Sequence, residues 1–143
     1  MRVEESIRGA IFRTVELPGG QGRFMNCVEK GRRGEDLAAV YLLGQGYLIR
    51  HRNWRMKTGE IDIIAEKAGL LVFCEIKSRR NACYGSGAEA VNGRKQQRII
   101  RTALLYLQKF QLFNRPCRFD VVEILMSSPD CPLIHHIPNA FGM

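Results

Sequence analysis

The spacing of hydrophobic residues changes along the chain, and the changes indicate which elements it forms. Apolar residues recur at helical spacing at Leu37, Val40 and Tyr41, and again from Ile99 to Tyr106, which predicts two helices that each bury one face. Short apolar runs rich in β-branched residues predict strands. The expected order is a helix at 31–43, strands at 47–55, 59–65 and 71–77, a helix at 88–110, a strand at 118–126 and an edge strand at 133–137.

This order predicts an α/β fold with a mixed central sheet in one domain at 25–143. Gly93 falls inside the second expected helix, where glycine costs about 1 kcal/mol relative to alanine, so close packing or a kink is expected there. Residues 1–24 show no firm periodicity and include a turn-forming run at 17–22. They are expected to be a flexible N-terminal extension, or the product of a start codon assigned too far upstream.

Acidic residues interrupt the two apolar strands expected at 59–65 and 71–77. A tight connection near Ala68 would pair these strands as a hairpin and bring Asp62 near Glu75, while Glu75 and Lys77 share one face. An ionised carboxylate in a central strand is costly unless it is paired or holds a metal. Two carboxylates with a backbone carbonyl and waters suit Mg²⁺, and a neighbouring lysine can orient a water or neutralise a phosphate.

The spacing of these residues resembles the PD-(D/E)XK nuclease signature, with 12 residues between Asp62 and the Glu75-Ile76-Lys77 segment. From about residue 25 to the C-terminus the chain is similar to the bacterial YraN family, with Cys74 departing from an expected valine. The segments that carry the similarity are Gly34-Glu35, Gly44-Gln45-Gly46-Tyr47, Arg52-Asn53-Trp54-Arg55, Gly59-Glu60-Ile61-Asp62, Phe73-Cys74-Glu75-Ile76-Lys77-Ser78-Arg79, Gly85, Ala90-Val91, Lys95, Arg118-Phe119-Asp120-Val121-Val122 and Asn139-Ala140-Phe141.

The resemblance implies a restriction-endonuclease-like three-layer fold, similar to archaeal Holliday-junction resolvases. It implies a Mg²⁺- or Mn²⁺-dependent endonuclease that hydrolyses DNA, with branched DNA among the candidate substrates and a symmetric homodimer favoured for junctions. The expected catalytic residues are Asp62, Glu75, Lys77 and Glu35, and the expected metal ligands are Asp62, Glu75 and the backbone of Ile76.

Several of these residues have a structural interpretation as well. Glu35 is either a further acid at the metal site or a solvated first-turn glutamate that favours the helix dipole. Lys95 either reaches the active site, as the resemblance implies, or lies at the core edge with its charged end in water. Trp54 is expected in the core rather than stacked on a base, and His51 is expected to be structural. Asp120 is expected to pair with an arginine rather than join the site.

The net charge of +8 and the isoelectric point near 9.6 favour an anionic partner, with nucleic acid first and DNA ahead of RNA. A generic basic surface is the alternative. Arg79 and Arg80 open a loop directly after the strand that bears Glu75, a usual place for substrate contacts. The residues expected to contact phosphates are Arg52, Arg55, Arg79, Arg80, Arg94, Lys95, Arg98 and Arg101.

Hydropathy and cysteine usage indicate where in the cell the protein is expected. No apolar run approaches the ~20 residues of a membrane-spanning helix, and no secretory signal is visible. Five scattered cysteines without a C-x-x-C pair argue against a zinc site or a disulfide framework and for the cytoplasm. Two alternatives to the nuclease stay open. One is a nuclease-like module that binds nucleic acid without cutting it; the other is an interaction protein whose acids are paired with Lys77 and nearby arginines.

Overall fold

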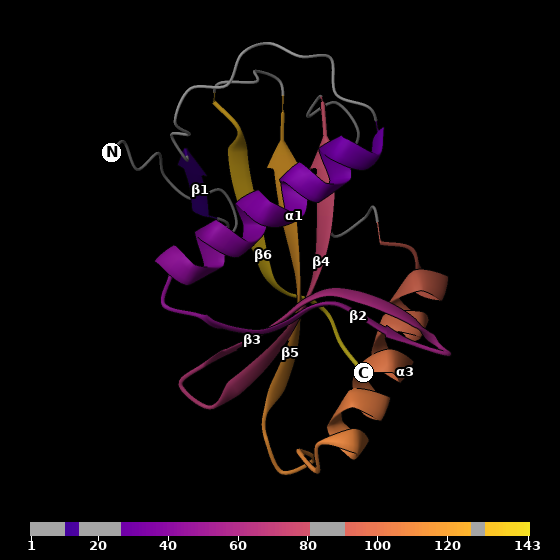
Figure 1. Ribbon diagram of the computed structural model, residues 1–143. Helices are drawn as coiled ribbons and strands as arrows, with labels where there is room; N and C mark the ends of the chain where they lie inside the picture. The colour runs from indigo at the N-terminus through magenta and orange to yellow at the C-terminus, as the bar shows by residue number, and fades with distance from the viewer. Residues whose placement is uncertain (1–10, 15–26, 81–90, 127–130) are drawn as a thin grey trace.

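The computed structural model describes residues 11–14, 27–80, 91–126 and 131–143, and its ribbon shows one sheet with helices packed on it (Figure 1). The elements follow the predicted order, with one strand added at the start of the chain. They are β1 (Ile11–Thr14), α1 (Cys27–Gly44), β2 (Leu48–Met56), β3 (Gly59–Lys67), β4 (Leu70–Arg79), α3 (Gly93–Lys109), β5 (Cys117–Leu125) and β6 (Leu133–Phe141).

The sheet has six strands in the order β1-β6-β5-β4-β3-β2. The pairing of β4 with β5 is parallel, and the other pairings are antiparallel. The segment that joins the two parallel strands contains α3, as a crossover connection requires. The predicted α/β fold with a mixed central sheet is therefore confirmed.

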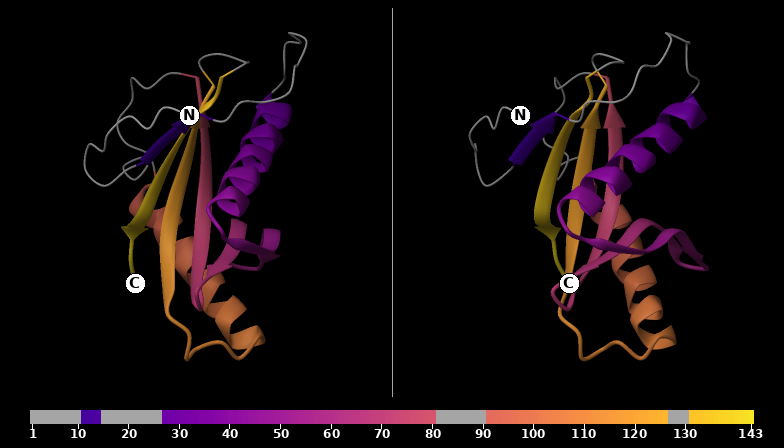
Figure 2. Two further views of the ribbon diagram at one scale, coloured as in Figure 1. Left: turned by 90° about the vertical axis from the view of Figure 1, so that its left-hand side faces the viewer. Right: turned by 60° about the vertical axis from the view of Figure 1, so that its left-hand side comes forward.

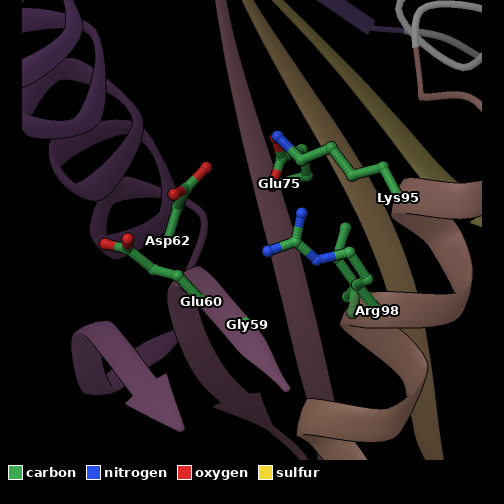
Figure 3. Close-up of a pocket in the computed structure, with 7 residues that line it drawn as sticks. Gly59, Glu60, Asp62, Glu75, Lys95 and Arg98 are labelled. Atoms are coloured by element: carbon green, nitrogen blue, oxygen red, sulfur yellow. The ribbon is translucent and has the colours of Figure 1, made fainter. Parts of the chain in front are cut away.

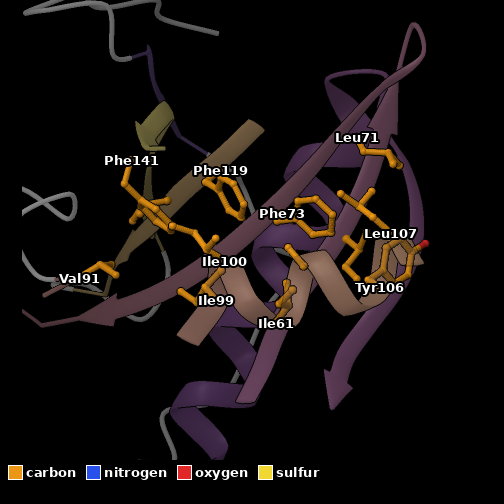
Figure 4. Packing of buried hydrophobic residues seen from close by; sticks show 13 residues of the cluster. Ile61, Leu71, Phe73, Val91, Ile99, Ile100, Tyr106, Leu107, Phe119 and Phe141 are labelled. Carbon is orange, nitrogen blue, oxygen red and sulfur yellow. The ribbon is translucent and has the colours of Figure 1, made fainter. Parts of the chain in front are cut away.

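Each face of the sheet packs against one helix. On one face, the ring of Tyr106 of α3 packs against Phe73 with ring centroids 5.8 Å apart, and Phe73 stacks on Phe119 with centroids 5.5 Å apart (Figure 4). On the other face, Leu42 of α1 packs with Val72 and other aliphatic residues, and Figure 2 shows α1 lying against that side of the sheet. The restriction-endonuclease-like three-layer arrangement expected from the resemblance is confirmed.

The second helix begins later than the sequence pattern predicted. The side chain of Asn92 caps it by accepting a hydrogen bond from the N–H of Lys95 at 3.0 Å, so Gly93 is the first helical residue. A Cβ atom built on Gly93 meets no atom within 4 Å. The expectation of close packing or a kink at Gly93 is therefore wrong, because the glycine lies at the helix start. The predicted residues 88–90 lie outside the described residues.

The last strand is not at the edge of the sheet. Its residues Leu133–His136 pair on their outer side with β1, from Thr14 opposite Leu133 to Ile11 opposite His136. The prediction of an edge strand at 133–137 is wrong for this reason. Four residues of β1 are too few to show a period, so the sequence pattern placed no strand there.

The β2–β3 hairpin leaves the plane of the sheet. The tight turn between β3 and β4 at Ala68 and Gly69 has positive φ angles of 49° and 81°, and pairing runs from there to Ile63 opposite Cys74. Before Ile63, β3 continues to pair with β2 alone, as far as Gly59 opposite Met56. The hairpin therefore separates from β4 and twists across the face of the sheet (Figure 1).

The rings of His51 and Trp54 on β2 pack against aromatic residues at the C-terminal end of α3. Trp54 packs against the hydrophobic cluster on the α3 side of the sheet, with its ring centroid 5.3 Å from that of Tyr106. The ring centroids of His51 and Trp54 are 4.8 Å apart. The packing of Trp54 and His51 agrees with the structural roles expected for them from the sequence.

In the described residues no helix is long and apolar enough to cross a bilayer.

Asp120 is fully buried and accepts two hydrogen bonds from Arg118, at 2.7 and 2.8 Å. His136 lies 2.7 Å from the same carboxylate, and the N–H of Asn139 donates to it at 2.9 Å. Burial acts to raise the pKa of Asp120, but these hydrogen bonds outweigh it and the pKa lies below its usual value. The expectation that Asp120 pairs with an arginine is confirmed.

Candidate active site

The acids of the hairpin meet where β3 and β4 separate. The carboxylate of Asp62 on β3 accepts a hydrogen bond from the N–H of Ile76 on β4 at 2.8 Å. This bond lies just beyond the last paired residues, Ile63 and Cys74, so a side-chain oxygen takes over from the backbone ladder. The separation leaves space between the strands that a continuous ladder would fill.

That space is a pocket of about 210 Å³ between the hairpin, β4 and α3 (Figure 3). Three elements contribute charged side chains to it, acids from the strands and bases from the helix. The lining residues are Gly59, Glu60, Asp62, Glu75, Lys95, Arg98 and Ile99. The pocket thus unites four of the residues expected from the sequence, namely Asp62, Glu75, Lys95 and Arg98. Gly59 and Glu60 were not expected there, because their position depends on the twist of the hairpin.

Two lysines neutralise the buried carboxylate of Glu75, whose residue is only 4% exposed. The ammonium group of Lys95 on α3 contacts Glu75 Oε1, and the Nζ atom of Lys77 lies 3.6 Å from the same oxygen. A carboxylate at this depth requires such partners, since an unpaired buried charge costs several kcal/mol. The structure therefore brings Glu75, Lys77 and Lys95 together.

The carboxylate of Asp62 forms no ion pair with the described residues and accepts one hydrogen bond, from the N–H of Ile76. Burial and the neighbouring charge of Glu75 raise its pKa from 3.8 to about 7, and the charge of Glu35 acts in the same direction. The hydrogen bond from Ile76 and the charge of Lys95 oppose the rise without cancelling it. Burial and the neighbouring charge of Glu75 thus disfavour the ionised form of Asp62, and a cation bound beside it would favour that form.

Lys95 stays protonated in this setting. Burial acts to lower its pKa, but the hydrogen bond to Glu75 and the charges of Glu75 and Asp62 outweigh burial and raise it. The ammonium group of Lys95 therefore carries a positive charge beside Glu75 in the pocket, rather than extending into water at the edge of the core.

Glu35 lies beside the site without lining the pocket. It is in the interior of α1, which begins at Cys27, so the first-turn interaction with the helix dipole does not apply. Its Oε2 atom accepts a hydrogen bond from the amide of Asn53 at 3.1 Å. The preceding Gly34 explains the close approach of α1 to β4, because a Cβ atom there would lie 1.9 Å from the Ser78 hydroxyl oxygen.

The donor set suits an ion that needs few protein ligands. Among the described residues, no three His, Cys, Asp or Glu side chains converge closely enough to hold a metal between them. The carboxylates of Asp62 and Glu75 supply oxygen at the separation of the strands, and Ile76 contributes its N–H to Asp62. Mg²⁺ prefers oxygen, keeps several waters and commonly uses one or two carboxylates. The residues present therefore fit Mg²⁺ or Mn²⁺ better than an ion that requires a protein cage.

The other arginines expected to contact phosphates are dispersed. Arg52 pairs with Asp36 at 2.5 Å, and Arg55 pairs with Glu60 at 3.2 Å. Arg79 has a side chain only 17% exposed and lies 3.4 Å from the buried Glu123, an acid that the sequence pattern did not single out. Arg80 of the following loop and Arg94 and Arg101 of α3 are exposed.

The sequence profile of the uncharacterised protein family UPF0102 matches residues 34–124. The chain belongs to the UPF0102 (YraN) family. A UPF0102 protein of Geobacter sulfurreducens is 46% identical over 127 residues, covering 89% of this chain and 98% of the relative. One of Symbiobacterium thermophilum is 50% identical over 115 residues, covering 78% and 94%.

A UPF0102 protein of Clostridioides difficile is 44% identical over 117 residues, covering 82% of this chain and all of the relative. The family assignment inferred from the motifs is confirmed by these matches. The matched segment 34–124 contains Glu35, Asp62, Glu75, Lys77 and Lys95, so the candidate site belongs to the part shared with the UPF0102 family. Membership does not by itself give an activity, which has to be argued from the site.

Proposed function

We propose that the protein is a Mg²⁺- or Mn²⁺-dependent endonuclease of the PD-(D/E)XK type that hydrolyses phosphodiester bonds in DNA, with branched DNA as a candidate substrate. The observation that carries the proposal is the meeting of Asp62 and Glu75 where β3 and β4 separate, in one pocket with Lys95 and close to Lys77. Buried acids that repel one another are a feature of catalytic sites rather than of stable cores.

Asp62, Glu75 and the carbonyl of Ile76 would hold the ion, with waters completing its coordination. The bound ion would polarise a phosphoryl oxygen and lower the pKa of a bound water. Asp62, whose pKa is raised to about 7 by burial and Glu75, would be ionised by the added positive charge. Glu35 would act through its charge or through a water, since it does not line the pocket.

Lys77 would orient the attacking water or neutralise the phosphate, because its Nζ atom lies 3.6 Å from Glu75 Oε1 at the same end of β4. In the reaction one bond forms between the water oxygen and phosphorus, and one phosphorus–oxygen ester bond breaks. The products are a phosphate monoester and a free hydroxyl group, with the proton of the water passing through solvent to the leaving oxygen. Each residue would therefore act by position and charge, as in other phosphoryl transfers.

The substrate would lie along the basic side of the pocket. Arg94 and Arg101 are exposed on α3, and the net charge of +8 favours a polyanion. A symmetric homodimer is part of the proposal, because a four-way junction offers two equivalent strands. The cytoplasm is its proposed place, with Cys74, Cys117 and Cys131 as free thiols.

The test is a cleavage assay with Mg²⁺ and Mn²⁺ on labelled single-stranded, duplex, flap and four-way-junction DNA, repeated with RNA. Asp62→Ala and Glu75→Ala are compared with wild type and with Glu66→Gln, an acid at the other end of β3 that pairs with Arg50 and Arg115. We expect wild type and Glu66→Gln to cut and both alanine variants to be inactive while still binding DNA. Equal cutting by wild type and Asp62→Ala would overturn the proposal.

A second candidate is a nuclease-like module that holds nucleic acid without cutting it. The contact between Lys95 and Glu75 favours it, because the lysine supplies the positive charge that an ion would otherwise bring. Urea unfolding with and without Mg²⁺ separates the two. An ion at 100 times its dissociation constant stabilises the folded state by about 2.7 kcal/mol, and the non-catalytic module predicts no such gain.

A further inference from the structure

Arg98 differs in position from the other arginines of α3. It lies one turn after Lys95, lines the pocket with Asp62 and Glu75, and Figure 3 shows its guanidinium pointing across the pocket towards the acids of β3. Arg94 and Arg101 do not line the pocket. Of the three arginines of α3, Arg98 therefore faces the acids, whereas Arg94 and Arg101 do not.

The turn of the β2–β3 hairpin is fixed to α3 beside this residue. The hydroxyl of Thr58 lies 2.7 Å from the hydroxyl of Thr102, which donates to the backbone carbonyl of Arg98 at 2.8 Å. A Cβ atom on Gly59 would lie 3.3 Å from the Thr102 hydroxyl and 3.8 Å from Arg98 Nε, at a φ of 152°. Glycine permits this approach, so the start of β3 lies directly beside Arg98.

The charge of Arg98 is available to a ligand. Two of the three acids of the pocket form ion pairs with cations other than Arg98. Glu60 pairs with Arg55, and Glu75 pairs with Lys77 and Lys95. In the part of the chain that the structure describes, Arg98 forms no ion pair. A guanidinium in a pocket, with its planar donors unpaired, matches the geometry of a phosphate group.

We propose that Arg98 is a catalytic residue that binds the scissile phosphate in the pocket, whereas Arg94 and Arg101 contact the backbone of the nucleic acid outside it. This inference rests on the proposed nuclease function and adds a specific ligand for one side chain. Charge that builds on the phosphoryl oxygens during hydrolysis would be stabilised by a donor held in place before the reaction. Lys95 would remain with Glu75, so the two bases of the pocket have separate tasks.

The experiment measures single-turnover cleavage at saturating enzyme for wild type, Arg98→Met, Arg98→Lys and Arg101→Met. Lys109→Met, at the far end of α3, controls for the loss of one positive charge, and thermal unfolding checks the folding of each variant. We expect Arg98→Met to lower the rate constant by about 100-fold or more, as loss of one such donor does elsewhere, with partial recovery in Arg98→Lys. Arg101→Met should weaken binding and reduce the salt dependence by about one ion.

A second readout is independent of the rate. The dissociation constant is measured in Ca²⁺ for DNA with and without a neutral methylphosphonate at the mapped cleavage position. Wild type and Arg101→Met should lose affinity when this phosphate is neutralised, and Arg98→Met should lose less, because only the ion and Lys77 would then still contact the phosphate. An Arg98→Met variant that cuts like Arg101→Met, or that keeps the full methylphosphonate penalty of wild type, would overturn the inference alone. A wild type that cuts no substrate would overturn the nuclease function and the inference with it.

Discussion

Replacing Asp62 by asparagine should stabilise the metal-free protein above neutral pH. Asparagine has nearly the same shape, and its amide oxygen can still accept the hydrogen bond that Ile76 donates to Asp62. The substitution removes only the charge, which burial and Glu75 disfavour. The acid should therefore be a cost to folding at pH 8 and nearly neutral to folding at low pH.

The magnitude follows from the pKa of Asp62, which is raised from 3.8 to about 7. Between these two values the folded state binds one more proton than the unfolded state, so stability falls as pH rises. One pKa unit corresponds to about 1.4 kcal/mol, so the full loss is about 4 kcal/mol. Roughly two thirds of this loss falls between pH 5 and pH 8.

Urea unfolding in EDTA at pH 5 and pH 8 measures the effect. We expect the free energy of unfolding of Asp62→Asn to exceed that of wild type by a margin that grows by about 2.5 kcal/mol over this range. Glu66→Gln serves as the control for removing a strand carboxylate outside the site. A margin that stays constant with pH would refute the claim that burial and Glu75 disfavour the charge of Asp62.

Two further predictions concern the scaffold of the site. Asp120→Asn should cost about 3 kcal/mol or more at pH 7, because it leaves Arg118 without its carboxylate. Since the pKa of Asp120 is lowered in the folded state, this cost should shrink as pH falls below about 4, which urea unfolding at pH 4 and pH 2 would check. Gly34→Ala should cost about 1 to 3 kcal/mol, because its Cβ atom overlaps the Ser78 hydroxyl. Thermal unfolding should show recovery when Ser78→Gly is added, and a double variant as unstable as Gly34→Ala would exclude this contact as the cause.

The elements with long periodic patterns could be predicted from the sequence, and so could the acids of the site. Asp62 and Glu75 lie in strands that are otherwise apolar, and a carboxylate there needs a reason that an exposed one does not. The period of two then places Lys77 on the same face as Glu75. The pairing near Ala68 required only a short turn, which is a local feature of the chain.

The features that were missed depend on contacts between distant residues. The strand at Ile11–Thr14 forms against residues near 135, and its own four residues show no period. The start of α3 is fixed by the cap at Asn92 rather than by the apolar pattern. The place of Arg98 depends on how far the hairpin twists away from β4, which no local pattern describes.

The separation of β3 from β4 explains why these acids are tolerated in an apolar sheet. In a continuous ladder the side chain of Asp62 would project from one face of the sheet into the layer packed on it, with little room for water or an ion. Because pairing stops at Ile63, the carboxylate instead occupies the position of a strand acceptor for the N–H of Ile76 and faces an open pocket. The hydrogen bond satisfies the N–H of Ile76 where the ladder ends, and the negative charge is available to a ligand in the pocket. The amide of an Asp62→Asn variant should still accept the hydrogen bond but supply no charge. A stable but inactive variant would therefore show that the charge of Asp62 is needed for activity and not for folding.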